Sequence, residues 1–225
     1  MNAWEQMVVW LNDPLNWTNT NGIVDRLGEH LIISGLAVLL GVLIGWPLGV
    51  SLGRTGRGGG FVVLLSNLTL AVPVIALLTI LPLTRLGFGK PPVVVALAVF
   101  AIPPLLATSY TAMREVDPEV RDAARGMGLS SPQLLWRVEL PLAVPYLAAG
   151  LRTASVQVVA TAALAALTNG GGLGMIISAG FGLGIAAGGG QILAGGIMVA
   201  FLALIVEGLG AVVQRLVTPR ALRRS

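Results

Sequence analysis

Long uncharged stretches, separated by short charged segments, dominate the pattern of hydrophobic and polar positions along the chain. Residues 31–53, 58–84 and 91–113 contain no Asp, Glu, Lys or Arg. Each stretch is long enough to cross about 30 Å of hydrocarbon as a helix. A further apolar run follows Glu139, and the glycine-rich residues 169–190 divide it into two. The pattern therefore predicts five spanning helices, at about 28–52, 60–83, 91–113, 142–168 and 190–213.

Composition places the chain among membrane proteins. Of its 225 residues 55% are hydrophobic and only 11% charged, and the mean hydropathy is +0.86, unlike a soluble domain. The chain has no cysteine, which excludes disulfides, thiolate catalysis and cysteine-based metal sites. The pI of about 10.6 comes from basic residues beside the apolar stretches, so membrane topology explains it better than nucleic-acid binding does.

The distribution of arginine predicts which side of the membrane each loop faces. Loops alternate sides, and one side collects ten arginines: Arg54, Arg57, Arg114, Arg121, Arg125, Arg137, Arg215, Arg220, Arg223 and Arg224. The other side has only Arg26, Arg85 and Lys90. Because positive charge concentrates in cytoplasmic loops, we expect the amino terminus outside and the carboxyl terminus inside.

The ends of the chain differ from its apolar middle. Residues 1–27 form an external or interfacial segment, 28–213 the membrane domain, and 214–225 a basic cytoplasmic tail. The first 22 residues lack the basic start and continuous apolar core of a signal peptide. Trp4, Trp10 and Trp17 predict a short amphipathic helix at the membrane interface, with a loosely ordered tail as the alternative.

The cytoplasmic loop 114–141 is the largest hydrophilic segment, and its residues predict two short helices. Asp117 is placed to cap a helix from Pro118 to Arg125, since acidic residues and proline favour a helix start. Gly126 and Gly128 then end that helix. We expect a second helix after the pair Ser130 and Ser131.

Small side chains mark the surface of the first loop helix. Ala123 and Ala124 allow another backbone to approach closely, which suits a docking surface. A loop that merely lies on the membrane is the alternative.

The same loop resembles the cytoplasmic signature of permease subunits of bacterial binding-protein-dependent ABC importers. The signature has an acidic residue, two alanines, a glycine four residues on, and an aliphatic residue shortly before Leu-Pro. The matching residues are Asp122, Ala123, Ala124, Gly128, Val138, Leu140 and Pro141. Aspartate replaces the commoner glutamate and valine the commoner isoleucine, with the spacing intact.

The resemblance implies an all-α, type I importer permease fold in the bacterial cytoplasmic membrane, with several partners. A separate ATPase subunit would contact the loop, including Gly126, and would use ATP and Mg; no cofactor is expected on this chain, which lacks a Gly-rich phosphate loop. An external substrate-binding protein, a second permease subunit and membrane lipid complete the expected partners. We expect a transport subunit and no enzyme, since no catalytic pair lies at membrane depth.

Four further segments are similar to permeases for compatible solutes such as glycine betaine, choline and carnitine. They are Ile44–Arg54, Ala71–Leu97, Ala107–Gly128 and Leu151–Ile177. Methionine permeases share the loop and the GGLG piece, so a methionine or other amino-acid importer is the alternative. A carrier or channel independent of ATP is an alternative of another class. The aromatic residues are scattered among the spans, with no cluster at a helical spacing that would suggest a cage for a quaternary ammonium, so we expect selectivity to belong to the binding protein.

Two more sets of residues are candidates for function. On the external side, NGGGLG comprises Asn169, Gly170, Gly171, Gly172, Leu173 and Gly174; it is expected to gate the outer mouth or to dock the binding protein, or else simply to connect two helices. Arg152 and Glu207 are charges at similar depth in the last two spans. Charge in a span is costly unless paired or hydrated, so we expect them to pair or to face the transport path. The single histidine, His30, is expected at the surface.

Overall fold

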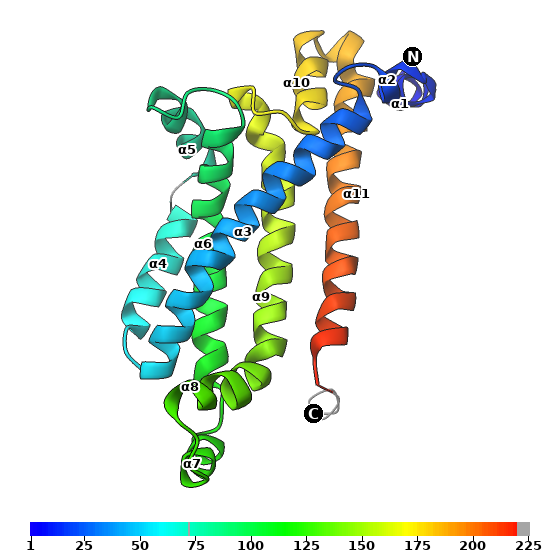
Figure 1. The fold of residues 1–225 in the computed structure, drawn as a ribbon. Helices are drawn as coiled ribbons and strands as arrows, with labels where there is room; N and C mark the ends of the chain where they lie inside the picture. Colours follow the sequence, from blue (N-terminus) through cyan, green and yellow to red (C-terminus); the bar gives the residue numbers. More distant parts are fainter. Residues whose placement is uncertain (72, 220–225) are drawn as a thin grey trace.

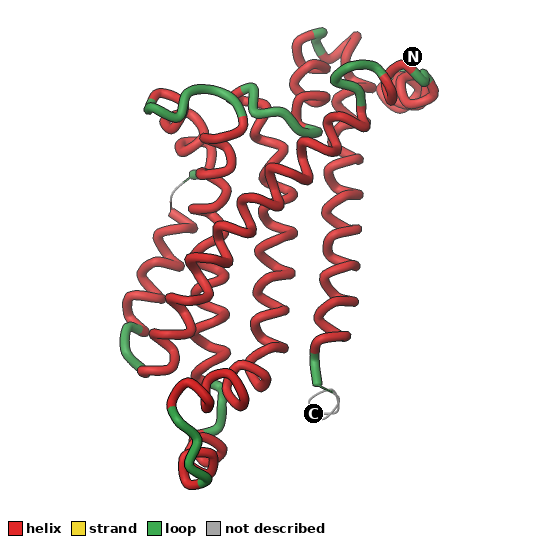
Figure 2. The backbone as a smooth tube through the Cα atoms, in the orientation of Figure 1, coloured by secondary structure: helices red, strands yellow, loops and turns green. Residues whose placement is uncertain are grey.

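The computed structural model describes residues 1–71 and 73–219, and helices account for most of this part of the chain (Figure 1). The backbone drawn by secondary structure shows helices joined by short loops (Figure 2). In chain order the elements are α1 (Ala3–Asn12), α2 (Leu15–Thr18), α3 (Ile23–Thr55), α4 (Gly59–Ala71), α5 (Val74–Ile80), the 3-10 helix η1 (Leu81–Leu83), α6 (Lys90–Arg114), α7 (Pro118–Gly126), α8 (Ser131–Leu134), the π-helix η2 (Leu135–Glu139), α9 (Leu140–Thr161), the 3-10 helix η3 (Ala162–Thr168), α10 (Gly174–Gly182) and α11 (Ile185–Val217).

Four helical segments of the described chain are long and apolar enough to cross a membrane. They are Leu15–Thr55, Lys90–Arg114, Ser131–Thr168 and Ile185–Val217. α3 crosses the bundle diagonally, whereas α6, α9 and α11 run more nearly upright (Figure 1). α3 begins earlier than the predicted residue 28, and α11 earlier than 190. α11 ends at the same end of the bundle as α7 and α8, and the amino terminus lies at the opposite end, as the arginine distribution predicts. The last three arginines of that distribution lie outside the described residues.

The second predicted span, 60–83, is not one continuous helix. It consists of α4 and α5, which follow one another along the side of α6 (Figure 1). Pro73 has an extended backbone, with φ −65° and ψ 126°, and its ring removes the N–H that a continuing helix needs. The return pass between the two ends of the bundle is therefore made of two short helices.

A glycine seam joins α3 to α6, the two helices in most extensive contact. Gly41, Gly45, Gly49 and Gly53 recur every fourth residue on the buried face of α3. A Cβ atom on Gly45 would lie 3.0 Å from the Ile102 carbonyl oxygen. Small residues at this spacing let two helix backbones approach closely, which is a principal source of attraction between helices in lipid.

The amino-terminal segment is helical and is fastened to the start of α11. Asn2 and Glu5 form a capping box that begins α1. The Gln6 side-chain amide donates to the Ala186 carbonyl at 2.9 Å and accepts from the Gly190 N–H at 3.1 Å. Since both ends of this amide are used, the segment is a docked helix, and the alternative of a loosely ordered tail is wrong.

Candidate functional site

The first helix of the cytoplasmic loop forms as predicted. Asp117 caps α7, its carboxylate accepting from the Glu119 N–H at 2.8 Å. α7 ends at Gly126, one residue after the predicted end, and Gly128 follows with φ +83°, a left-handed conformation that glycine adopts readily. The Leu129 N–H donates to the Ala124 carbonyl at 3.2 Å and closes the turn.

The second part of the loop runs without interruption into a spanning helix. Ser130 and Gln133 form a capping box at the start of α8. α8 continues into the π-helix η2, and η2 into α9 at Leu140. Leu140 and Leu135 pack against a buried cluster that includes Met113 of α6. α8 is therefore continuous with the membrane helix α9.

The two alanines of the loop differ in their exposure. Ala123 is exposed as predicted, but Ala124 is only 2% exposed, so the expectation that both lie on the surface is wrong. α7 packs on α8 and η2, and because a helix turns about 100° per residue, adjacent residues point in different directions and only Ala124 lies on the packed side.

Apolar side chains extend the exposed face of the loop. Met127 is 75%, Trp136 70% and Val120 40% exposed. Asp122 and Arg125 form an exposed ion pair of 3.1 Å on α7. The exposed residues Gly126, Gly128 and Pro141, with the half-buried Val138, complete the predicted set. Three uncovered apolar side chains thus lie in this loop at one end of the bundle, and they are suited to contact with another protein.

A buried carboxylate lies behind this face, and the sequence reasoning missed it. Glu139 is 1% exposed, and its two oxygens contact Arg54 and Arg121. The available signal was a lone acidic residue directly before a long apolar run. Its partners are 85 and 18 positions away in sequence, so no local pattern identifies them.

The external loop 169–174 is folded into the chain. Asn169, Gly171 and Gly172 have positive φ values of 52°, 87° and 80°. Asn169 is exposed, whereas the five residues that follow it are buried. Direct contact of a partner with those five residues is therefore blocked by this chain's own side chains.

Two neighbouring side chains of α3 hold this loop in place. Glu29 accepts from the Gly172 N–H at 3.0 Å, and contacts Arg26 at 2.8 Å and Lys90 at 3.1 Å.

His30 lies next to Glu29 and is fully buried, so its predicted surface position is wrong. Its Nδ1 accepts from the Leu173 N–H at 3.2 Å, and its Nε2 lies 2.9 Å from the Val159 carbonyl. A neutral ring with its proton on Nε2 satisfies both contacts. His30 thereby connects α3 to α9 and to the external loop.

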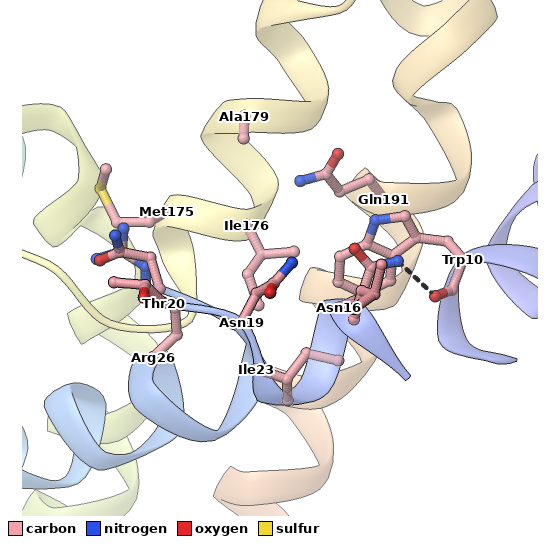
Figure 3. A pocket seen from close by; sticks show the side chains of 13 residues that line it. Trp10, Asn16, Asn19, Thr20, Ile23, Arg26, Met175, Ile176, Ala179 and Gln191 are labelled. Carbon is pink, nitrogen blue, oxygen red and sulfur yellow. Dashed lines mark hydrogen bonds between the residues drawn. The ribbon is translucent and has the colours of Figure 1, made fainter. Parts of the chain in front are cut away.

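A hollow of about 360 Å³ opens beside this loop, between the amino-terminal segment, α3, α10 and α11 (Figure 3). Trp10 and Gln191 lie on one side of the hollow and Arg26 on the other. The Asn16 amide donates to the Trp10 carbonyl at 2.8 Å, and Asn19 adds another amide to the lining. The walls combine these polar side chains and one aromatic ring with apolar side chains such as Ile23 and Ile176.

Arg152 and Glu207 meet between α9 and α11. Their Nε and Oε1 atoms are 3.2 Å apart, and the side chains are 33% and 43% exposed. Arg152 also donates from Nη1 to the Gln214 side-chain oxygen at 2.9 Å. The predicted pair is present, and its partial exposure leaves one side open within this chain.

Comparison with known proteins gives one family model and several similar proteins, all of them transport components. The family model described as "Binding-protein-dependent transport system inner membrane component" matches residues 37–219. The chain is 36% identical to the glycine betaine/carnitine/choline transport system permease protein OpuCB of Bacillus subtilis, over 95% of this chain and 97% of that one. It is 34% identical to the osmoprotectant import permease protein OsmW of Salmonella typhimurium, over 87% and 91%.

A solved structure extends the likeness to the fold. A chain from inward-facing conformations of the MetNI methionine ABC transporter matches with a TM-score of 0.78 and 26% identity. The match covers 92% of this chain and 100% of that one.

Proposed function

The chain belongs to the family of binding-protein-dependent transport system inner membrane components, and we propose that it carries glycine betaine or a related quaternary ammonium solute. As a permease subunit of an ABC importer it lies in the cytoplasmic membrane and crosses it several times. The observation that carries the proposed substrate is the 36% identity to OpuCB over nearly the whole of both chains. The methionine alternative has weaker support, because the MetNI chain is 26% identical.

A separate ATPase subunit docks on the exposed face of α7 and hydrolyses ATP with Mg. The uncovered side chains of Val120 on α7, Met127 directly after α7 and Trp136 on the nearby η2 support this assignment, and Ala123 lets the partner's backbone approach. Ala124 has a different role from the one its sequence position implies: it packs α7 against the rest of the loop.

Transport proceeds by alternating access between two permease subunits, identical or homologous. Closure of two ATPase subunits moves α7 of each permease, and the spanning helices follow. The solute meets few strong binding groups on the way, as passage requires entry without retention. The side chains of Arg152 and Glu207, between α9 and α11, are partly exposed. A second subunit would cover them, or they would face a hydrated path.

A loaded external binding protein docks at the end of the bundle that carries α10. The end of α10, the turn after it and the start of α11 expose Phe181 by 60%, Leu183 by 62% and Ile185 by 78%, an apolar edge suited to a protein partner. The loop 169–174 then acts as a gate element, since Glu29 and His30 tie it to α3.

Uptake and co-purification test the two parts of this proposal. Cells that lack their own osmoprotectant uptake receive this permease with its cognate ATPase and binding protein, and uptake of labelled glycine betaine, choline, carnitine and methionine is compared. Uptake of methionine alone would overturn the substrate assignment.

Docking is tested by Ala123→Trp, which should release the ATPase from the purified permease. Ala187→Trp is the matched control, because Ala187 is also exposed but lies in the first turn of α11, which begins at the other end of the bundle. Retention of the ATPase by the Ala123→Trp permease would contradict the proposed docking face.

A further inference from the structure

Glu139 occupies the point where the loop meets the membrane helices. It is the last residue of η2, directly before α9, and is 1% exposed. Its Oε2 lies 2.5 Å from Arg54 Nε, at the cytoplasmic end of α3. Its Oε1 lies 3.1 Å from Arg121 Nε, on α7. One carboxylate therefore contacts two arginines from two other helices.

Each arginine makes a second contact that enlarges the cluster. Arg54 Nη2 donates to the Ser131 carbonyl at 2.7 Å and lies 3.1 Å from the Ser131 hydroxyl. Arg121 Nη2 donates to the Met113 carbonyl of α6. The cluster of Arg54, Arg121, Ser131 and Glu139, here called the carboxylate clamp, thus joins α3, α6, α7, α8 and the start of α9.

Burial makes the clamp harder to open than a surface ion pair. A buried carboxylate that loses an arginine partner is left as an uncompensated charge away from water. The pair Asp122–Arg125 on α7 is 73% and 63% exposed, and water replaces such a partner at little cost. When α7 is displaced, the contacts of the carboxylate clamp therefore stay closed and its residues move together with α7.

We propose that Glu139 is a positioning residue that transmits movement of α7 to the cytoplasmic ends of α3 and α9. This inference rests on the proposed docking of an ATPase on α7. The chain leaving α7 passes through Gly128 in a left-handed turn. Because glycine restricts the backbone least, this turn transmits movement of α7 poorly. The clamp supplies the stiff connection that the turn lacks.

The test uses the assembled transporter, with its ATPase and binding protein, in liposomes. Glu139→Gln keeps the shape of the side chain and removes its charge. We expect the ATPase to stay bound and to hydrolyse ATP, while solute transported per ATP falls about tenfold, within the usual range of coupling between sites. Glu139→Asp restores the charge on a shorter side chain and should recover part of the ratio. Asp25→Asn, at an exposed carboxylate in the first turn of α3, is the control and should change nothing.

The ratio of transport to hydrolysis separates positioning from general stability. Equal ratios for wild type and Glu139→Gln would overturn the inference, as would losses of both activities in proportion to the amount of assembled complex. If Glu139→Gln does not fold, Arg121→Gln gives the decisive measurement, because Glu139 keeps Arg54 as its partner. A wild-type complex without bound ATPase would refute the proposed function itself, which is a different result from an unchanged ratio in a working transporter.

Discussion

Gly49 is the tightest point of the seam between α3 and α6. A Cβ atom at this position would overlap the Ser109 hydroxyl and would lie 2.5 Å from the Leu106 carbonyl oxygen. The hydroxyl belongs to a side chain that can turn, but the carbonyl belongs to the backbone of α6. Gly49→Ala therefore forces the two helices apart by several tenths of an ångström along their most extensive contact.

The size of this effect follows from the cost of overpacking. Adding one carbon to a tightly packed site destabilises a protein by about 1–3 kcal/mol. For a chain of this length each kcal/mol shifts the midpoint of thermal unfolding by roughly 2–4 °C. We expect a decrease of about 2–12 °C for Gly49→Ala in mild detergent, followed by tryptophan fluorescence.

Gly35 is the matched control on the same helix, because a Cβ atom there has no neighbour within 4 Å. Gly35→Ala should leave the midpoint unchanged or raise it, since alanine favours the helix. Adding Ser109→Gly to Gly49→Ala should recover only part of the loss, because the Leu106 carbonyl stays in place. Equal midpoints for Gly49→Ala and Gly35→Ala would refute the seam as the source of stability.

Two further predictions concern polar contacts between helices. His30→Ala leaves the buried Leu173 N–H without its acceptor, which costs about 1–3 kcal/mol; hydrogen exchange at residues 170–174 should accelerate, and unchanged protection would contradict the role given to His30. Arg152→Glu and Glu207→Arg should each reduce uptake, whereas the double variant restores the pair and much of the uptake. If uptake by the double variant stays as low as in the single variants, uptake does not depend on the 3.2 Å contact between Arg152 and Glu207.

Local chemistry made much of the fold predictable. Spans begin and end at charges such as Lys90 and Arg114, because charge is excluded from hydrocarbon. Asp117 caps α7 and Gly128 closes its end, since capping and left-handed turns depend on single residue types. The permease signature was recognisable for the same reason, as its residues lie within one short segment.

Positions that depend on distant partners were not predictable. Pro73 interrupts the second span, yet Pro47, Pro103 and Pro145 lie inside continuous helices, so proline alone does not decide where a helix breaks. The neighbours that bury His30 come from α9 and the external loop.

The π-helical turn η2, between α8 and α9, determines how this part of the chain responds to the loss of a residue. A π turn contains an extra residue relative to the α-helix, and such insertions are common at functional sites. Deleting one residue from 135–139 would convert the π turn into an ordinary α turn and leave α8 and α9 in nearly the same relative rotation, because the wider π turn already absorbs the extra residue. Homologous permeases should therefore tolerate the loss of one residue here better than a deletion within α9, which would rotate α8 by about 100° relative to the rest of α9.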